Sequence, residues 1–199
     1  MIMKKQLLCS VVAGVLTVMN AGIVPSAHAA DGTKSLDLTV EATITSGTCS
    51  AKVMVGDVET NTIQLGDDIA LSEVLAKSRV KPFKVRFSDC AGLPESTATL
   101  KLARRSGNCG GSNGPTFRNL GGTSAGIGLE VWTSETPEGN DSVQLLCNTP
   151  NEQTIDISAA RNAGNLDYNM SARLVDATNV GSVTAGTFTS PTVLMISYK

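Results

Sequence analysis

The chain has 199 residues, and its 16 basic and 18 acidic side chains leave a formal net charge of −2. Apart from Arg104 and Arg105, which lie near Lys101, the basic residues form no dense block. A protein that binds nucleic acid needs a basic patch for the phosphates, so the composition argues against nucleic acid as a partner. Aromatic residues make up only 4% of the chain, which argues against a stacking platform for sugars.

The start of the chain has the pattern of a secretory signal peptide, which we place at residues 1–29. Two lysines precede an uncharged apolar run over residues 7–18, and Ala-His-Ala at residues 27–29 is the small-x-small site that signal peptidase recognises. A membrane anchor is the alternative, but a span needs about 20 apolar residues and this run is shorter. We therefore predict cleavage between Ala29 and Ala30 and export of the remainder as a soluble domain.

Cysteine usage fits export to an oxidising compartment. Cys9 lies in the predicted signal peptide, and an even number of cysteines remains, at Cys49, Cys90, Cys109 and Cys147. Four cysteines allow three pairings, of which we favour Cys49–Cys90 and Cys109–Cys147 because each cysteine follows or ends a strand-like run. A zinc site is the alternative, but the exported chain has neither a CxxC pair nor a histidine.

Alternation of apolar and polar residues with a period of two dominates the exported chain. It begins in the first run, where Leu36, Leu38, Val40, Ala42 and Ile44 share one face. The pattern returns at residues 83–87, 98–102, 127–131, 143–145, 168–174 and 192–198, and turn-forming stretches occur at 107–115, 121–122 and 137–141. Many short strands with one helical turn near residues 71–75 predict an all-β sandwich or barrel over residues 46–199, preceded by an N-terminal extension at 30–45.

Several of these features together resemble the pilin subunits of chaperone-usher fimbriae, the relatives of type 1 and P pili. The alternating extension lies shortly before Cys49, and Cys90 follows a strand about forty residues later. The chain ends with a penultimate Tyr198, and Gly186 is the fourteenth residue from the end, as in the closing motif of that family. The sequence departs from the family pattern at Ala42, where glycine is common, and in its second pair of cysteines.

The resemblance implies an incomplete immunoglobulin-like β-sandwich that lacks its last strand and is completed in trans by a donor strand. The donor would be residues 30–45 of the next subunit, with the five apolar residues named above inserted into the open groove. A periplasmic chaperone would first lend a strand, and the residues expected to recognise it are Gly186, Leu194, Ile196, Tyr198 and Lys199. The implied function is a structural subunit of a cell-surface fimbria used for adhesion. Its implied partners are the chaperone, the outer-membrane usher and neighbouring pilins, with a host receptor as a further candidate.

Other classes of function have less support. The only histidine, His28, leaves with the signal peptide, so a Ser-His-Asp or Cys-His device is not expected, and we predict no enzyme. The glycine-rich stretch at 110–114 lacks the Lys-Ser/Thr of a phosphate loop, and the aspartates at 67, 68, 141 and 176 lack calcium-loop spacing, so no cofactor or metal is expected. The main alternatives are a secreted β-sandwich that binds carbohydrate or acts as an adhesin, and a first segment that folds onto its own domain as an edge strand.

Overall fold

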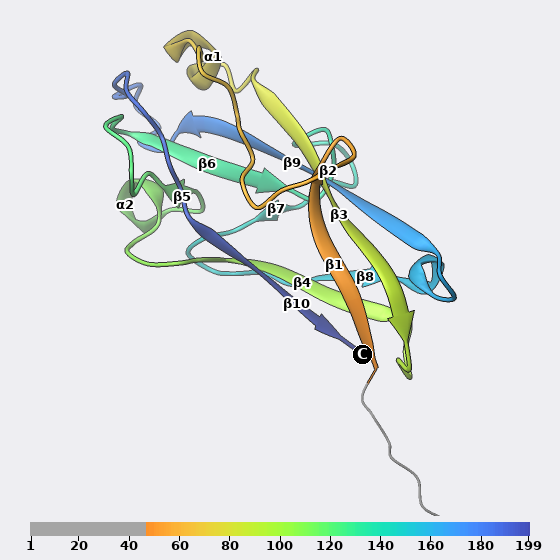
Figure 1. The fold of residues 1–199 in the computed structure, drawn as a ribbon. Helices are drawn as coiled ribbons and strands as arrows, with labels where there is room; N and C mark the ends of the chain where they lie inside the picture. Colours follow the sequence, from red (N-terminus) through yellow and green to blue (C-terminus); the bar gives the residue numbers. More distant parts are fainter. Residues whose placement is uncertain (1–46) are drawn as a thin grey trace, which may run out of the picture. The chain divides into compact units, whose positions relative to one another are not determined.

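The computed structural model describes residues 47–199, and this part of the chain is built almost entirely from antiparallel strands (Figure 1). The elements are β1 (Thr48–Val55), β2 (Val58–Glu59), α1 (Leu71–Leu75), β3 (Val80–Ala91), β4 (Thr97–Arg104), α2 (Gly110–Asn113), β5 (Phe117–Arg118), β6 (Ile127–Trp132), β7 (Gln144–Leu145), β8 (Gln153–Asp156), a 3-10 turn (Ser158–Ala160), β9 (Asn165–Asp176) and β10 (Thr192–Tyr198). The predicted residues of signal cleavage, Ala29 and Ala30, lie outside the described residues. So do the predicted donor residues Leu36, Leu38, Val40, Ala42 and Ile44.

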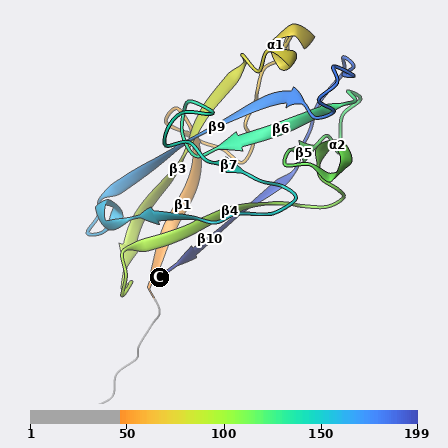
Figure 2. The same ribbon diagram turned by 180° about the vertical axis from the view of Figure 1, so that it is seen from behind.

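The strands form two sheets. The larger sheet has the order β2-β1-β3-β9-β6-β5, with β7 also paired to β6, and the smaller sheet has the order β10-β4-β8. The two sheets pack as layers of a sandwich, which is visible from both sides in Figures 1 and 2. The prediction of an all-β sandwich is therefore confirmed.

The predicted alternation places one face of each long strand in the core. On β3, Phe83, Val85 and Phe87 are buried between the sheets, whereas Lys84 and Arg86 lie on the outer face and form ion pairs with Asp167 of β9. The registers of β3 with β9 and of β9 with β6 bring these inward rows together. The core is thus assembled from alternate residues of strands that are distant in the sequence.

Some local predictions need correction. The predicted strand at residues 143–145 shortens to β7, and the side chain of Val143 is 41% exposed because this residue lies in the loop before the strand, whereas Leu145 is fully buried. The predicted loop at 107–115 contains the short turn α2, whose backbone is non-helical at Gly111 and Ser112. The helical turn at 71–75 is present as α1, where the carboxylate of Glu73 accepts a hydrogen bond from the backbone N–H of Ala70.

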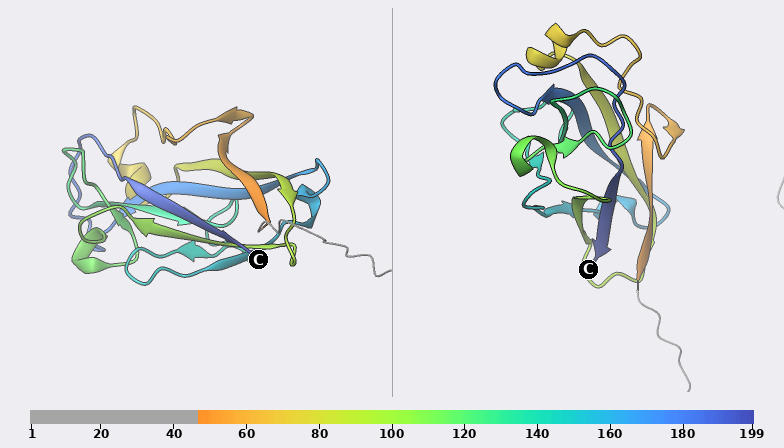
Figure 3. Two further views of the ribbon diagram at one scale, coloured as in Figure 1. Left: turned by 60° about the horizontal axis from the view of Figure 1, so that its bottom comes forward. Right: turned by 90° about the vertical axis from the view of Figure 1, so that its left-hand side faces the viewer.

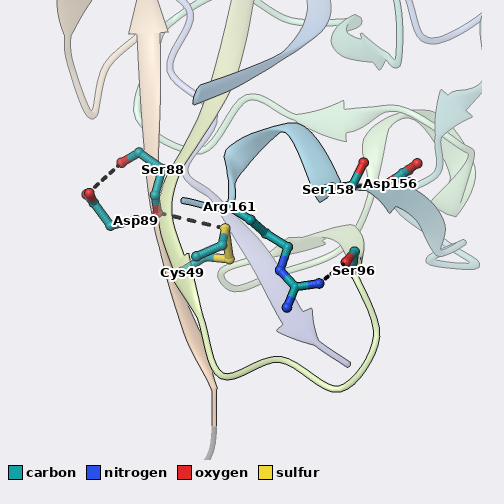
Figure 4. The surroundings of a disulfide bond; sticks show 8 residues. Cys49, Ser88, Asp89, Ser96, Asp156, Ser158 and Arg161 are labelled. Atoms are coloured by element: carbon teal, nitrogen blue, oxygen red, sulfur yellow. Dashed lines mark hydrogen bonds between the residues drawn. A yellow bond between two sulfur atoms is a disulfide. The ribbon is translucent and has the colours of Figure 1, made fainter. Parts of the chain in front are cut away.

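Two disulfides join the strands in the favoured sequential pairing. Cys49–Cys90 connects the start of β1 to the end of β3, and Cys109–Cys147 connects the entry of α2 to the segment after β7. Figure 4 shows the first of these beside Arg161, whose Nη1 donates to Oγ of Ser96 at 2.8 Å. In the loop-entropy account, closing loops of this length removes about 4 kcal/mol of freedom from the unfolded chain per bond. Within the described residues, no helix is long and apolar enough to span a membrane.

Candidate functional site: an open groove between two edge strands

A groove lies between β1 and β10, which line it with Val53 on one side and with Thr192 and Leu194 on the other. β10 pairs only with β4 and is the edge strand of the smaller sheet, whereas β1 pairs with β3 and, only at Met54 and Val55, with the two-residue β2. The two strands run beside each other and converge toward the C-terminus, as Figure 1 and both views of Figure 3 show. The groove encloses about 720 Å³.

The floor of the groove is apolar. It is made by inward side chains of four strands from both sheets, namely Phe83, Leu102, Ile127, Leu129, Val131, Met170, Ala172 and Leu174. Segments 61–71 and 185–194 contribute most of its walls. Because the floor lacks charged groups, an occupant gains free energy by burying apolar side chains there, at roughly 25 cal/mol per Å² of apolar surface.

The hydrogen bonds of β10 show which of its backbone groups are free. Lys199 N–H donates to the carbonyl of Thr97 at 3.0 Å, and Arg105 N–H donates to the carbonyl of Pro191 at 3.4 Å. In an antiparallel pair, residues that bond to one neighbour alternate with residues that face the other side, so the odd-numbered residues of β10 bond to β4. The backbone N–H and C=O groups of Thr192, Leu194, Ile196 and Tyr198 therefore face the open edge.

The opposite edge of the groove has the same character over a shorter length. The carbonyl of Val53 accepts a hydrogen bond from Thr60 N–H at 2.9 Å, so the odd-numbered residues in this part of β1 face away from β3. The backbone groups of Ala51, two residues before this contact, thus also face away from β3. Folded proteins usually cover or interrupt such edges. An apolar groove with an unpaired strand edge on each side is suited to accept an added strand.

Comparison with known proteins identifies the family. No family model matches the chain. The chain is 40% identical over 176 residues to the fimbrial-like protein YadL of Escherichia coli strain K12, a match that covers 84% of this chain and 86% of that protein. The chain belongs to the fimbrial-like proteins.

Two solved structures have the same fold. The P pilus rod subunit PapA matches this pilin with a TM-score of 0.52 at 16% identity, over 76% of this chain and 99% of PapA. A chaperone-usher pilus structure that concerns rod uncoiling matches with a TM-score of 0.51 at 14% identity, over 90% of this chain and 100% of its own. The predicted family and the predicted immunoglobulin-like pilin fold are confirmed.

Three of the residues predicted to recognise a chaperone lie on the inward face of β10, and one of them, Leu194, lines the groove. The side chains of Leu194, Ile196 and Tyr198 are half-buried and pack against the core, while Val193 and Met195 point to the outside. Burial raises the pKa of the Tyr198 phenol above its ordinary value. The structure thus places these residues at the open edge, and their role toward a chaperone stays a prediction.

Gly186 has a structural role in the pilin itself. Its φ is +151°, and a Cβ at this position would lie 2.6 Å from the backbone nitrogen of Ser124. The surrounding segment bonds to residues 119–125, for example through Ser124 N–H to the carbonyl of Thr187 at 3.0 Å. Glycine therefore allows the wall segment that leads into β10 to lie directly on a neighbouring loop.

Asn119, which the sequence did not reveal, holds this wall segment in place. Its side-chain oxygen accepts hydrogen bonds from the backbone N–H of Gly122 and of Thr189, each at 2.9 Å. Its side-chain nitrogen donates to the carbonyls of Ser124 and Thr187 at 2.9 and 3.1 Å. One asparagine thus joins two segments that are far apart in the sequence, and no periodic pattern marks it.

A buried charged cluster on the outer face of the larger sheet was also not predicted. Arg173 Nη2 lies 2.7 Å from Glu130 Oε2, and both residues are nearly fully buried. Arg173 also bonds to Glu138 and lies over the ring of Trp132, and Lys77 is within 3.8 Å of both glutamates. Each charge has an opposite partner, so the cluster serves to hold the loop after β6 on the sheet.

Proposed function

We propose that this pilin, a structural subunit of a cell-surface fimbria, polymerises by accepting the N-terminal segment of a neighbouring subunit as a strand between β10 and β1. The observation that carries the proposal is the free backbone edge of β10 beside a groove of about 720 Å³ with an apolar floor. A strand added there would pair with β10 and cover the floor, which is the mode of binding called strand addition.

The sequence of residues 35–44 supports this segment as the donor. Its even-numbered residues, Leu36, Leu38, Val40, Ala42 and Ile44, are apolar, and its odd-numbered residues are Ser, Asp, Thr, Glu and Thr. An extended segment with this alternation presents one apolar face to the groove and one polar face to solvent. Burying a large aliphatic side chain contributes about 1.5–3 kcal/mol, so several together approach the 5–15 kcal/mol net stability of a whole domain.

The same open edge supports a requirement for a periplasmic chaperone. A subunit released into the periplasm exposes an apolar groove and unpaired strand edges, which favour aggregation. A chaperone strand that bonds to Leu194, Ile196 and Tyr198 and holds the Lys199 carboxylate would protect it until the usher presents the next subunit. Export through the periplasm, the usher, adhesion and any host receptor belong to this proposal as the remaining steps.

We also propose that the protein has no enzymatic role. Its four cysteines in the described residues are paired in disulfides, and the one histidine of the chain is His28. A thiol or imidazole nucleophile is therefore not provided by residues 47–199. The groove fits a strand of peptide, and binding such a strand requires no bond to be made or broken.

The experiment that tests the proposal is thermal unfolding of the exported chain, in a variant whose own segment cannot act as a donor (Val40→Asp), with a synthetic peptide of residues 31–45. Completion of the sandwich by several kcal/mol raises Tm by about 10 °C or more, at roughly 2–4 °C per kcal/mol for a domain of this size. A peptide that itself carries Val40→Asp is the matched control and gives no rise. An unchanged Tm with the wild-type peptide would mean that the domain is complete, and would favour the carbohydrate-binding module.

A further inference from the structure

The outer face of β10 carries a row of residues that the groove does not use. Val193 is 41% exposed, Met195 is 46% exposed, and Ser197 follows them on the same face. The cross-strand neighbours of this row on β4 are Ala103, Lys101 and Thr99. Within the described residues, no segment covers Val193 or Met195. The position of this row along the open edge makes it a neighbour of any strand that enters the groove.

The hydrogen-bond pattern of β10 determines how a donor strand would meet this row. Because the even-numbered residues of β10 face the open edge, an antiparallel donor forms hydrogen-bonded pairs with them. The odd-numbered residues then form the non-hydrogen-bonded pairs, whose Cα atoms are only about 4.5 Å apart and whose side chains are in direct contact. Val193, Met195 and Ser197 would each contact one outward-facing donor residue.

The length of the edge selects one register. The donor has five apolar residues at alternate positions, from Leu36 to Ile44, and β10 with the residues before it offers alternate positions from Ser190 to Tyr198. If the donor were shifted by two residues toward the C-terminal end of β10, Leu36 would lie beyond Lys199, the last residue of the chain. Moving it the other way would place Ile44 opposite Phe188, between Thr187 and Thr189, which are already bonded to the loop at 119–124.

We propose that Val40 of the donor lies opposite Leu194, and that the row Val193, Met195 and Ser197 contacts the outward face of the donor and contributes to its selection. In this register Glu41 lies beside Val193, Thr39 beside Met195 and Asp37 beside Ser197. This inference rests on the proposed function, and it adds the register and a set of contacts outside the groove.

The chemistry of the row agrees with these pairs. The row itself contains no acidic side chain, so Asp37 and Glu41 meet no like charge on β10. Lys101 of β4, the cross-strand partner of Met195, forms an ion pair at 3.1 Å with Glu152, an acidic residue near Met195 and Ser197. Thr39 is β-branched, and such residues pack well beside an apolar cross-strand neighbour. A donor with an acidic outward face is therefore accepted.

Disulfide trapping tests the register. Cysteine is placed at Met195→Cys in the Val40→Asp chain, and peptides of residues 31–45 carry one cysteine each, at Thr39→Cys, Asp37→Cys, Glu41→Cys or Val40→Cys. A non-hydrogen-bonded pair brings two cysteines within the Cα separation that a disulfide needs, about 4.4–6.8 Å. Under mild oxidation we expect the Thr39→Cys peptide to cross-link at least tenfold faster than the other three.

The outcomes separate the inference from the proposed function. Peptides that raise Tm but cross-link fastest through Asp37→Cys or Glu41→Cys overturn the register while strand addition stands. Fastest cross-linking through the Val40→Cys peptide overturns the assignment of the even-numbered residues of β10 to the open edge. Peptides that neither raise Tm nor cross-link overturn both proposals.

Val193→Lys provides a second test, because the affinity of this variant for the wild-type peptide should rise about two- to fivefold and this gain should disappear with a Glu41→Gln peptide. An equal gain with both peptides would contradict the Glu41–Val193 contact.

Discussion

Tyr198, the penultimate residue, packs edge-on against Phe87 of β3, with ring centroids 6.5 Å apart and ring planes at 85°. Tyr198 belongs to the smaller sheet and Phe87 to the larger sheet, so this contact joins the two layers at the C-terminal end of the groove. The T-shaped arrangement is a favourable one for aromatic rings. The contact explains how the last strand is held in place although one of its edges is open.

Removal of this ring should therefore destabilise the subunit. We expect Tyr198→Ala to lower the free energy of unfolding by about 2 kcal/mol, less than the 3–5 kcal/mol of a fully buried aromatic residue because Tyr198 is only half-buried. Urea unfolding followed by circular dichroism measures the change. The control is Tyr198→Phe, which keeps the ring and should stay within about 0.5 kcal/mol of the wild type. Equal losses in both variants would contradict a role of the ring contact.

Substitution of Gly186 should cost more than its backbone angle alone requires. Gly186→Ala adds a Cβ that meets the backbone of Ser124 at 2.6 Å, at a φ of +151°. We expect a loss of about 3 kcal/mol in unfolding free energy. Gly181→Ala is the matched control, since Gly181 also has a positive φ but nothing lies within 4 Å of its added Cβ, and it should lose only about 1 kcal/mol. Similar values for the two variants would show that the close approach to Ser124 is unimportant.

The buried charged cluster predicts unequal effects of its two glutamates. Glu130→Gln removes the buried partner of Arg173 and should lower the unfolding free energy by about 3 kcal/mol. Glu138→Gln removes a partner whose side chain is 56% exposed and should cost less than about 1 kcal/mol. Fluorescence of Trp132, the single tryptophan, follows urea unfolding of both variants. The prediction fails if Glu138→Gln is the more damaging change.

Acid should destabilise the subunit through Asp167. Both carboxylate oxygens of Asp167 accept hydrogen bonds from Arg86, and one of them is also bonded by Lys84. These bonds hold the pKa of Asp167 far below its usual value, although partial burial opposes the shift. Because the folded pKa is lower than the unfolded value of about 3.9, this stabilisation is complete above that value and is lost as the pH falls below it. The urea midpoint should therefore decrease from pH 5 to pH 2.5.

The Asp167→Asn variant isolates this contribution. It should show a shallower decrease of the urea midpoint over the same pH range, because its side chain no longer titrates. Asp156 and Asp176 also have lowered pKa values, owing to hydrogen bonds from Ser158 and from Thr178, so some decrease remains. Parallel curves for the variant and the wild type would exclude Asp167 as a main source of acid sensitivity.

The sequence by itself determined the features that depend on local pattern. Period-two alternation at Phe83, Val85 and Phe87 and along the last strand predicted both the strands and their inward faces, because successive side chains of a strand point to opposite sides. Cysteines that follow or end strand-like runs indicated the favoured pairing. The family was recognisable from Tyr198 and Gly186 at their distances from the end of the chain.

Only the tertiary structure decided the features that depend on which segments meet. Glu130 and Arg173 have the sequence of exposed strand positions, yet they are buried because a loop covers the outer face of β6 and β9. Asn119 joins its own loop to the wall segment at 185–194, through Thr187 and Thr189, and no local pattern encodes this contact. The backbone N–H and C=O groups of Leu194 point to the open edge because of the way β10 pairs with β4. Which residues of a strand bond to its neighbour is set by the two strands together, so the sequence of one strand does not reveal it.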